Sequence, residues 1–280
     1  TLLGHLNFTE LTQLHLCFKN GDQTEITRFG QLVEKIPNTL QFLEIRLKTK
    51  DGRLAYPRQF CELLCEGLQQ WPALHTLLVD GKVYNHDVKP HQSLSQALSY
   101  VPELRVLMLT TTIAGVDSIV LPPLPQLHTL LIQTFSDVPS KLIPSLIHLT
   151  ALTDLSLFAH HGSHFDELNA VFPTRLRKLA LRGPTPRHEK TLFQLYSKLD
   201  HMPELPHLEL PMSWMGESEP WRKTNRFPWL WTNIGMNNPL QLTQLAQRDH
   251  LPTALHLTSL IEPALLLPFH TLQSLRLSAE

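Results

Sequence analysis

The segment "FAHHGSHFDE", residues 158–167, concentrates side chains that could bind a metal ion. It holds His160, His161 and His164, followed by Asp166 and Glu167. Imidazole nitrogens and carboxylate oxygens are ligands for Zn²⁺ or Ni²⁺, and the chemistry would be metal-assisted catalysis. The spacing matches no established ligand pattern, however, and we expect a connecting loop, whose polar residues are usually solvated. A metal-binding enzyme, or a regulator of one, that uses the His160–Asp166 cluster is therefore the alternative function.

The three cysteines, Cys17, Cys61 and Cys65, predict no disulfide chemistry. A small and odd number argues against a disulfide framework and favours a reducing compartment. Cys61 and Cys65 form a Cys-x-x-x-Cys spacing, whereas a redox or metal motif would be Cys-x-x-Cys. Both are interleaved with apolar residues, among which cysteine is usually a small core residue. We expect both to be buried and structural.

No motif of a known catalytic class is present. The chain lacks the G-x-S-x-G elbow, the Walker loop and H-E-x-x-H. Its formal net charge is −1 and no basic block stands out, so the sequence does not favour a nucleic-acid partner. No uninterrupted apolar stretch approaches the length of a membrane span. We predict a non-enzymatic protein that needs no cofactor.

Four of the five tryptophans cluster near residues 211–239, at Trp214, Trp221, Trp229 and Trp231. We interpret this stretch as an irregular insertion. Its segment "FPWLW" is expected to pack inward. Trp214 or Trp221, together with Arg222 and Arg226, is expected to be presented outward, because aromatic and arginine side chains anchor partners at binding hot spots.

The rest of the chain follows a leucine rhythm. The pattern L-x-x-L-x-L, with some degraded copies, starts at residues 11, 40, 74, 104, 127, 152, 176, 205, 252 and 272. Each copy alternates apolar and variable residues, which is typical of a strand with one buried face. About ten copies in near-register indicate a repeat architecture.

Segments with helical periodicity lie between the copies, for example residues 57–71, 91–101, 190–202 and 239–252. In the first of them, large apolar residues fall on one stripe: Phe60, Leu63, Leu64, Leu68 and Trp71. A proline two residues before the first leucine, as in "WPALHTL" and "VPELRVL", marks the end of the helix and the return to extended chain.

This pattern resembles the leucine-rich-repeat family over essentially the whole chain. The resemblance implies an α/β fold: one solenoid domain over residues 1–280, with about ten repeats, a parallel sheet on the concave face and mostly helices on the convex face. The repeat lengths are similar to the ribonuclease-inhibitor and F-box-receptor styles. The family usually has Asn or Cys at the ninth repeat position, but here the residues are Lys19, Lys48, Lys82, Thr112, Phe135, His160, Pro184 and Ser213. We therefore expect an irregular solenoid.

The residues between the leucines are expected to form the concave surface. Leu78, Met108 and Leu131 are adjacent in its middle row, with Val106 beside them and Phe158 near the edge. A contiguous apolar patch on a polar sheet is a candidate site for a protein or peptide, unless a loop or a further terminus covers it.

The expected function is a non-catalytic interaction module, either a substrate-recognition arm of a larger assembly or an effector-type binder. We expect it in the cytoplasm, or in a host cell's cytoplasm if it is an effector. The last copy, "LQSLRLSAE", lacks a polar cap, so further domains or a dimer are expected at that end.

Overall fold

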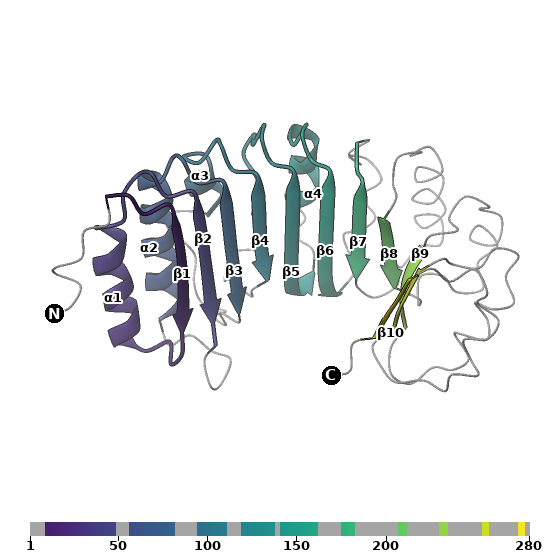
Figure 1. Ribbon diagram of the computed structural model, residues 1–280, viewed down its shortest axis with the longest axis horizontal. Coiled ribbons are helices and arrows are strands. Elements are labelled where there is room, and N and C mark those ends of the chain that lie inside the picture. Colours follow the sequence, from purple (N-terminus) through teal and green to yellow (C-terminus); the bar gives the residue numbers. More distant parts are fainter. Residues whose placement is uncertain are drawn as a thin grey trace, which may run out of the picture.

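One parallel β-sheet runs through the whole structure (Figure 1). The computed structural model describes residues 9–48, 56–81, 94–110, 119–137, 141–161, 175–182, 207–211, 230–234, 254–257 and 274–277. Eleven strands follow one another in chain order. They are β1 (Gln13–Phe18), β2 (Phe42–Leu47), β3 (Thr76–Gly81), β4 (Val106–Thr110), β5 (Thr129–Asp137), β6 (Asp154–His161), β7 (Lys178–Arg182), β8 (His207–Pro211), β9 (Leu230–Ile234), β10 (Ala254–Leu257) and β11 (Ser274–Leu277).

The strands coincide with the leucine pattern. Each of the ten copies predicted from the sequence contains a strand that begins at the third position of the pattern, so the predicted strands are confirmed. In five copies the first leucine closes a turn: the N–H of Leu74, for example, donates to the Trp71 carbonyl at 3.0 Å. Pro72 occupies the second position of that turn, where its fixed φ is favoured. The recurring spacing of proline and leucine therefore sets the entry into the strand.

The described helices all lie on one side of the sheet, behind the strands in Figure 1. They are α1 (Gln23–Val33), α2 (Pro57–Gln70), α3 (Leu94–Leu98), α4 (Leu142–Ser145) and a 3₁₀ helix, η3 (Leu146–His148). Helix α1 packs on α2, and α2 packs on α3. The helix predicted over 57–71 is confirmed. The one predicted over 91–101 is helical only at Leu94–Leu98 among the described residues, and those at 190–202 and 239–252 lie outside them.

The leucines of the pattern form the core between the sheet and the helices. Leu43, Leu77, Leu107 and Leu130 pair in register from strand to strand, and each is 0 % exposed. Since alternate residues of a strand point to opposite faces, the residues between these leucines point to the other face of the sheet, where no described helix lies. We call that side the exposed face. No described helix is long and apolar enough to cross a membrane.

The turn from β1 into α1 is held by two carboxylates. Asp22 caps the helix by accepting a hydrogen bond from the Glu25 N–H at 2.9 Å. The Glu25 carboxylate reaches back to the N–H groups of Lys19, Asn20 and Gly21, at 3.2, 3.1 and 2.7 Å. The Glu25 N–H is a helix donor that has no partner within the helix, and the N–H groups of Lys19, Asn20 and Gly21 belong to the turn before it. The backbone that follows β1 is thereby fixed.

The tryptophan-rich stretch contains a strand. The sequence pattern predicts an insertion near 211–239, but β9, at Leu230–Ile234, lies in the sheet between β8 and β10. Leu230 pairs with Leu208, and Trp231 pairs with both Glu209 and Ala254. For these five residues the insertion is corrected to a further strand. Phe227 and Thr232 stand where the pattern has leucines, so the copy that contains β9 does not match the leucine pattern.

Apart from Pro211, which ends β8, the other residues of that stretch lie outside the described residues. They include Trp214, Trp221, Arg222 and Trp229. The expectation that some of these side chains are presented outward and others packed inward therefore stays a prediction.

Candidate functional site

The exposed face carries its side chains in straight rows across the strands. The pairing of β1 to β7 aligns the middle row residue by residue, as predicted from the sequence. That row consists of His15, Glu44, Leu78, Met108, Leu131, Ser156 and Ala180. Its character changes along the sheet, from polar over β1 and β2 to apolar over β3, β4 and β5.

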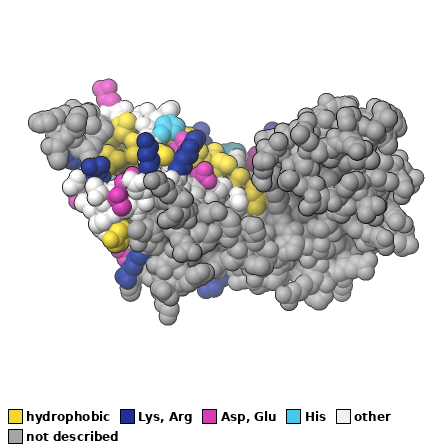
Figure 2. Space-filling view, turned by 90° about the horizontal axis from the view of Figure 1, so that it is seen from below, with side chains coloured by type: hydrophobic (Ala, Val, Ile, Leu, Met, Phe, Trp, Pro, Cys, Tyr) yellow, Lys and Arg dark blue, Asp and Glu magenta, His cyan; other side chains and the backbone are white. Residues whose placement is uncertain are grey.

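Four of the predicted site residues lie together at the centre of this face. Leu78 pairs with Met108 and Met108 with Leu131, and Val106 lies two residues before Met108 on β4. All four side chains are half-buried. Because paired strands are about 4.8 Å apart, the three middle-row residues span about 10 Å. We call Leu78, Val106, Met108 and Leu131 the apolar patch, and Figure 2 shows hydrophobic side chains running between charged ones on the described part of the molecule.

Phe158 sits at the margin of the patch rather than within it. It pairs with Gln133, two residues beyond Leu131 on β5, and is half-buried. A diagonal neighbour across two strands is about 7–8 Å away, which an aromatic ring can bridge. On the next rungs of the middle row, Ser156 and Ala180 are buried, so the accessible part of that row ends at Leu131.

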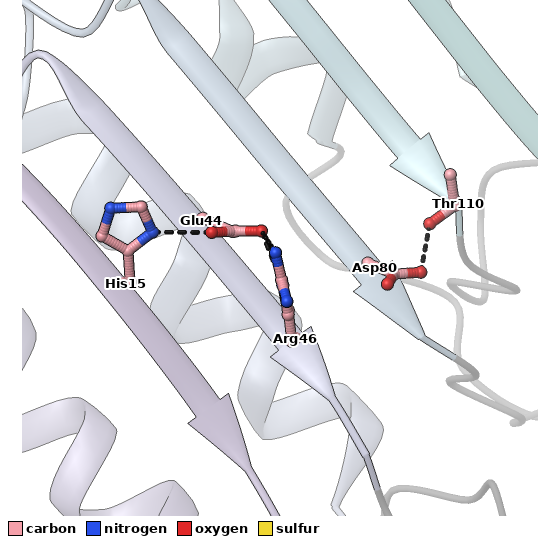
Figure 3. A network of polar contacts seen from close by, with 5 residues as sticks. All are labelled: His15, Glu44, Arg46, Asp80 and Thr110. Atoms are coloured by element: carbon pink, nitrogen blue, oxygen red, sulfur yellow. Dashed lines mark hydrogen bonds and ion pairs between the residues drawn. The ribbon is translucent and has the colours of Figure 1, made fainter.

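A network of three polar side chains occupies the β1–β2 end of the face (Figure 3). His15 Nδ1 lies 2.6 Å from Glu44 Oε2, and Arg46 Nε donates to Glu44 Oε1 at 2.6 Å. His15 and Arg46 are 60 % and 51 % exposed, whereas Glu44 between them is 14 % exposed. The His15 ring also lies 4.9 Å from the ring of Phe42.

This network holds Glu44 in its charged form. The hydrogen bonds from His15, and then from Arg46, lower the pKa of the Glu44 carboxyl below its ordinary value. A carboxyl whose pKa is lowered by folding stabilises the folded state at pH values above its ordinary pKa. This contribution to the free energy of unfolding is lost as the pH falls through the pKa of the folded state. Both oxygens of Glu44 are thus occupied by neighbours within the protein.

A second polar contact borders the patch at the C-terminal ends of β3 and β4. The Thr110 hydroxyl donates to Asp80 Oδ1 at 2.5 Å, joining β4 to β3 (Figure 3). The leucine pattern by itself assigns no role to the polar residues of this face. The signal was present: His15 and Glu44 fall on one rung, and Glu44 and Arg46 are two residues apart on one strand. Opposite charges at such positions pair across or along strands.

The two cysteines of α2 are core residues, as predicted. Cys61 is 9 % exposed and Cys65 is 2 % exposed, and the three cysteines form no disulfide. Burial, reinforced by the neighbouring thiol, raises the pKa of Cys61 to about 12. Burial also raises the pKa of Cys65 to about 11. Thiols of this kind are poor nucleophiles, because the thiolate is the reactive species.

The contrast with Cys17, which is exposed on β1, predicts a difference in reactivity. At neutral pH a thiol reagent such as dithiobis-nitrobenzoate should label Cys17 in the folded protein, and Cys61 and Cys65 only after denaturant is added. Above the ordinary thiol pKa of 9.0, the folded protein keeps protons that the unfolded chain releases, so stability falls as the pH rises towards about 12. The order in which the three thiols react is measured by labelling followed by peptide mass mapping. Equal labelling of all three sites without denaturant would contradict the burial of α2.

The histidine cluster is only partly described. His160 and His161 belong to the end of β6, so these two are in a strand and not in the predicted loop. His164, Asp166 and Glu167 lie outside the described residues. Within the described part of the chain, no three His, Cys, Asp or Glu side chains are grouped to hold a metal ion. The metal-binding alternative therefore gains no support and stays untested.

No protein-family model matches the chain, and no curated protein matches it. The proposed function therefore rests on the geometry of the exposed face.

Proposed function

We propose that the chain is a leucine-rich-repeat protein that acts as a non-catalytic binding module. The fold supports this through one parallel sheet in which ten of the eleven strands begin at the third position of the leucine pattern, with the described helices on one side. The partner is a protein or peptide that docks on the exposed face, which corresponds to the concave side in that family. Thiols without a disulfide fit a reducing compartment such as the cytoplasm.

The observation that carries the proposal is the apolar patch itself. Leu78, Met108 and Leu131 are consecutive in register, half-buried and bordered by polar side chains. The core leucines Leu43, Leu77, Leu107 and Leu130 are 0 % exposed and point the other way, so the patch is not needed to cover the core. Contiguous apolar surface surrounded by polar residues is the usual anatomy of an interface centre.

Met108 lies at the middle of the patch, and Met108→Glu is the sharpest test. A carboxylate at the centre of an apolar contact must be desolvated without a partner, so binding should weaken by about 2 kcal/mol or more, roughly thirtyfold. The partner is first captured from an extract with the wild-type chain, and its affinity is then measured by calorimetry with purified components.

Ile147→Glu is the matched control. Ile147 is 62 % exposed on η3, on the helix side, so the same change should leave both affinity and fold intact. Circular dichroism of both variants checks the fold. A partner that binds Met108→Glu and wild type equally well would exclude the patch as the binding site.

A further inference from the structure

Three cations gather at one end of the apolar patch, where β1 and β2 leave the sheet. Lys19 directly follows β1, Lys48 directly follows β2, and both side chains are exposed. The Lys48 N–H donates to the Phe18 carbonyl at 2.8 Å, which keeps the two strand ends adjacent. Arg46, two residues before Lys48, is 51 % exposed. We call Lys19, Arg46 and Lys48 the cationic cluster.

Of the carboxylates around this cluster, Glu44 accepts hydrogen bonds from His15 and from Arg46 itself, so the charge of Arg46 is paired. Asp80 is exposed and is the register partner of Arg46. Both oxygens of Glu25 accept backbone N–H groups. Among the described residues, Lys19 and Lys48 form no ion pair. These two lysines therefore present their charges to solvent, and Figure 2 shows Lys and Arg side chains beside the hydrophobic band.

The cluster and the patch are close enough to contact one ligand. Glu44 pairs in register with Leu78, and Arg46 lies two residues beyond Glu44 on the same strand. At strand spacings of about 4.8 Å and rises of about 3.3 Å per residue, the Arg46 and Leu78 backbones are about 8 Å apart. A single extended segment can therefore cover both.

We propose that the partner docks through a segment that combines apolar side chains with Asp or Glu, the acidic end lying over β1 and β2. This inference rests on the proposed function and adds the chemistry and the direction of the partner. The apolar side chains bury against Leu78, Met108 and Leu131, and the carboxylates meet the cationic cluster. Complementary charge at the rim sets orientation and speeds association, while the apolar centre contributes most of the affinity.

A displayed library of random short peptides, panned against the whole chain, tests this chemistry directly. Enriched peptides should carry Asp or Glu beside apolar residues. Synthetic versions should bind a Lys19→Glu/Lys48→Glu variant about tenfold more weakly than wild type at low ionic strength. The difference should shrink as salt is added, because exposed charges are screened.

The matched control is Arg28→Glu/Lys141→Glu, which makes the same charge change on exposed residues of α1 and of the turn before α4. It should bind like wild type. Leaving Arg46 unchanged keeps the Glu44 network intact in all variants.

The outcomes separate this inference from the proposed function. In one outcome, peptides lose binding with Met108→Glu but show no acidic preference and no response to Lys19→Glu/Lys48→Glu. This would contradict the acidic partner segment and leave the proposed binding face supported. Peptides that bind Met108→Glu unchanged would overturn both. Equal weakening by the two charge-reversal variants would show a non-specific charge effect and overturn the inference.

Discussion

Replacing Trp71 by alanine should lower the free energy of unfolding by about 3–5 kcal/mol, because it removes a large, fully buried ring from the core. Trp71 is 0 % exposed at the end of α2 and precedes the turn into β3. Within the described part of the chain, its indole N–H is buried with no hydrogen-bond partner. Trp71→Phe should therefore cost less than Trp71→Ala, since it keeps a ring and removes the unpaired donor.

Gly67 provides the matched partner for a double-mutant cycle. A Cβ at Gly67 would lie 2.2 Å from the Trp71 ring, so Gly67→Ala alone should destabilise the protein by about 1–3 kcal/mol despite the better helix propensity of alanine. Without the Trp71 ring this clash disappears, and Gly67→Ala should become neutral or stabilising. Urea unfolding of both single variants and the double variant measures the coupling. Additive effects would show that Gly67 does not contact Trp71.

Gly81→Ala should be nearly as damaging, with a loss on the order of 3 kcal/mol from strain and overlap together. Gly81 ends β3 with a φ of +133°, a backbone conformation open essentially to glycine alone. A Cβ there would lie 2.5 Å from Leu47 Cβ and 2.7 Å from the Leu47 carbonyl oxygen. Since Leu47 is its register partner on β2, the two strands would have to separate.

Gly21→Asn is the control, because it replaces a glycine whose φ is also positive. Gly21 has a φ of +64°, in the left-handed region that asparagine also visits, and it lies in the capped turn before α1. Thermal melts should show a small change for Gly21→Asn and a large one for Gly81→Ala. A melting temperature of Gly81→Ala close to that of wild type would mean that the end of β3 can rearrange. In that case the close approach of β2 and β3 would not depend on glycine.

Much of the exposed face follows from periodicity. The rows that contain Leu78, Met108 and Leu131 were predictable because side chains alternate along a strand and copies in register repeat the same alternation. The burial of Cys61 and Cys65 followed likewise from their place on the apolar stripe of a helix.

Other features were beyond this logic. The strand at Leu230–Ile234 has Thr232 where the pattern expects leucine, so pairing with β8 and β10, not composition, identifies it. The end of the accessible row at Leu131 depends on the burial of Ser156 and Ala180, which the order of residues along one strand does not reveal. The strand position of His160 and His161 depends on the extended pairing of β6 with β5.

By itself, the sequence determined which residues form ten of the eleven strands, which face of each of these strands is apolar and where proline sets the turns. These properties arise from contacts within a few residues, so they can be predicted from spacing. Only the tertiary structure decided that Glu44 is shared by His15 and Arg46, that the Lys48 N–H donates to the Phe18 carbonyl, and that Gly67 leaves room for the Trp71 ring. The contacts of His15 with Glu44 and of Lys48 with Phe18 join different strands. The contact of Gly67 with Trp71 depends on the rotamer of the Trp71 ring. Tertiary packing therefore determines these contacts.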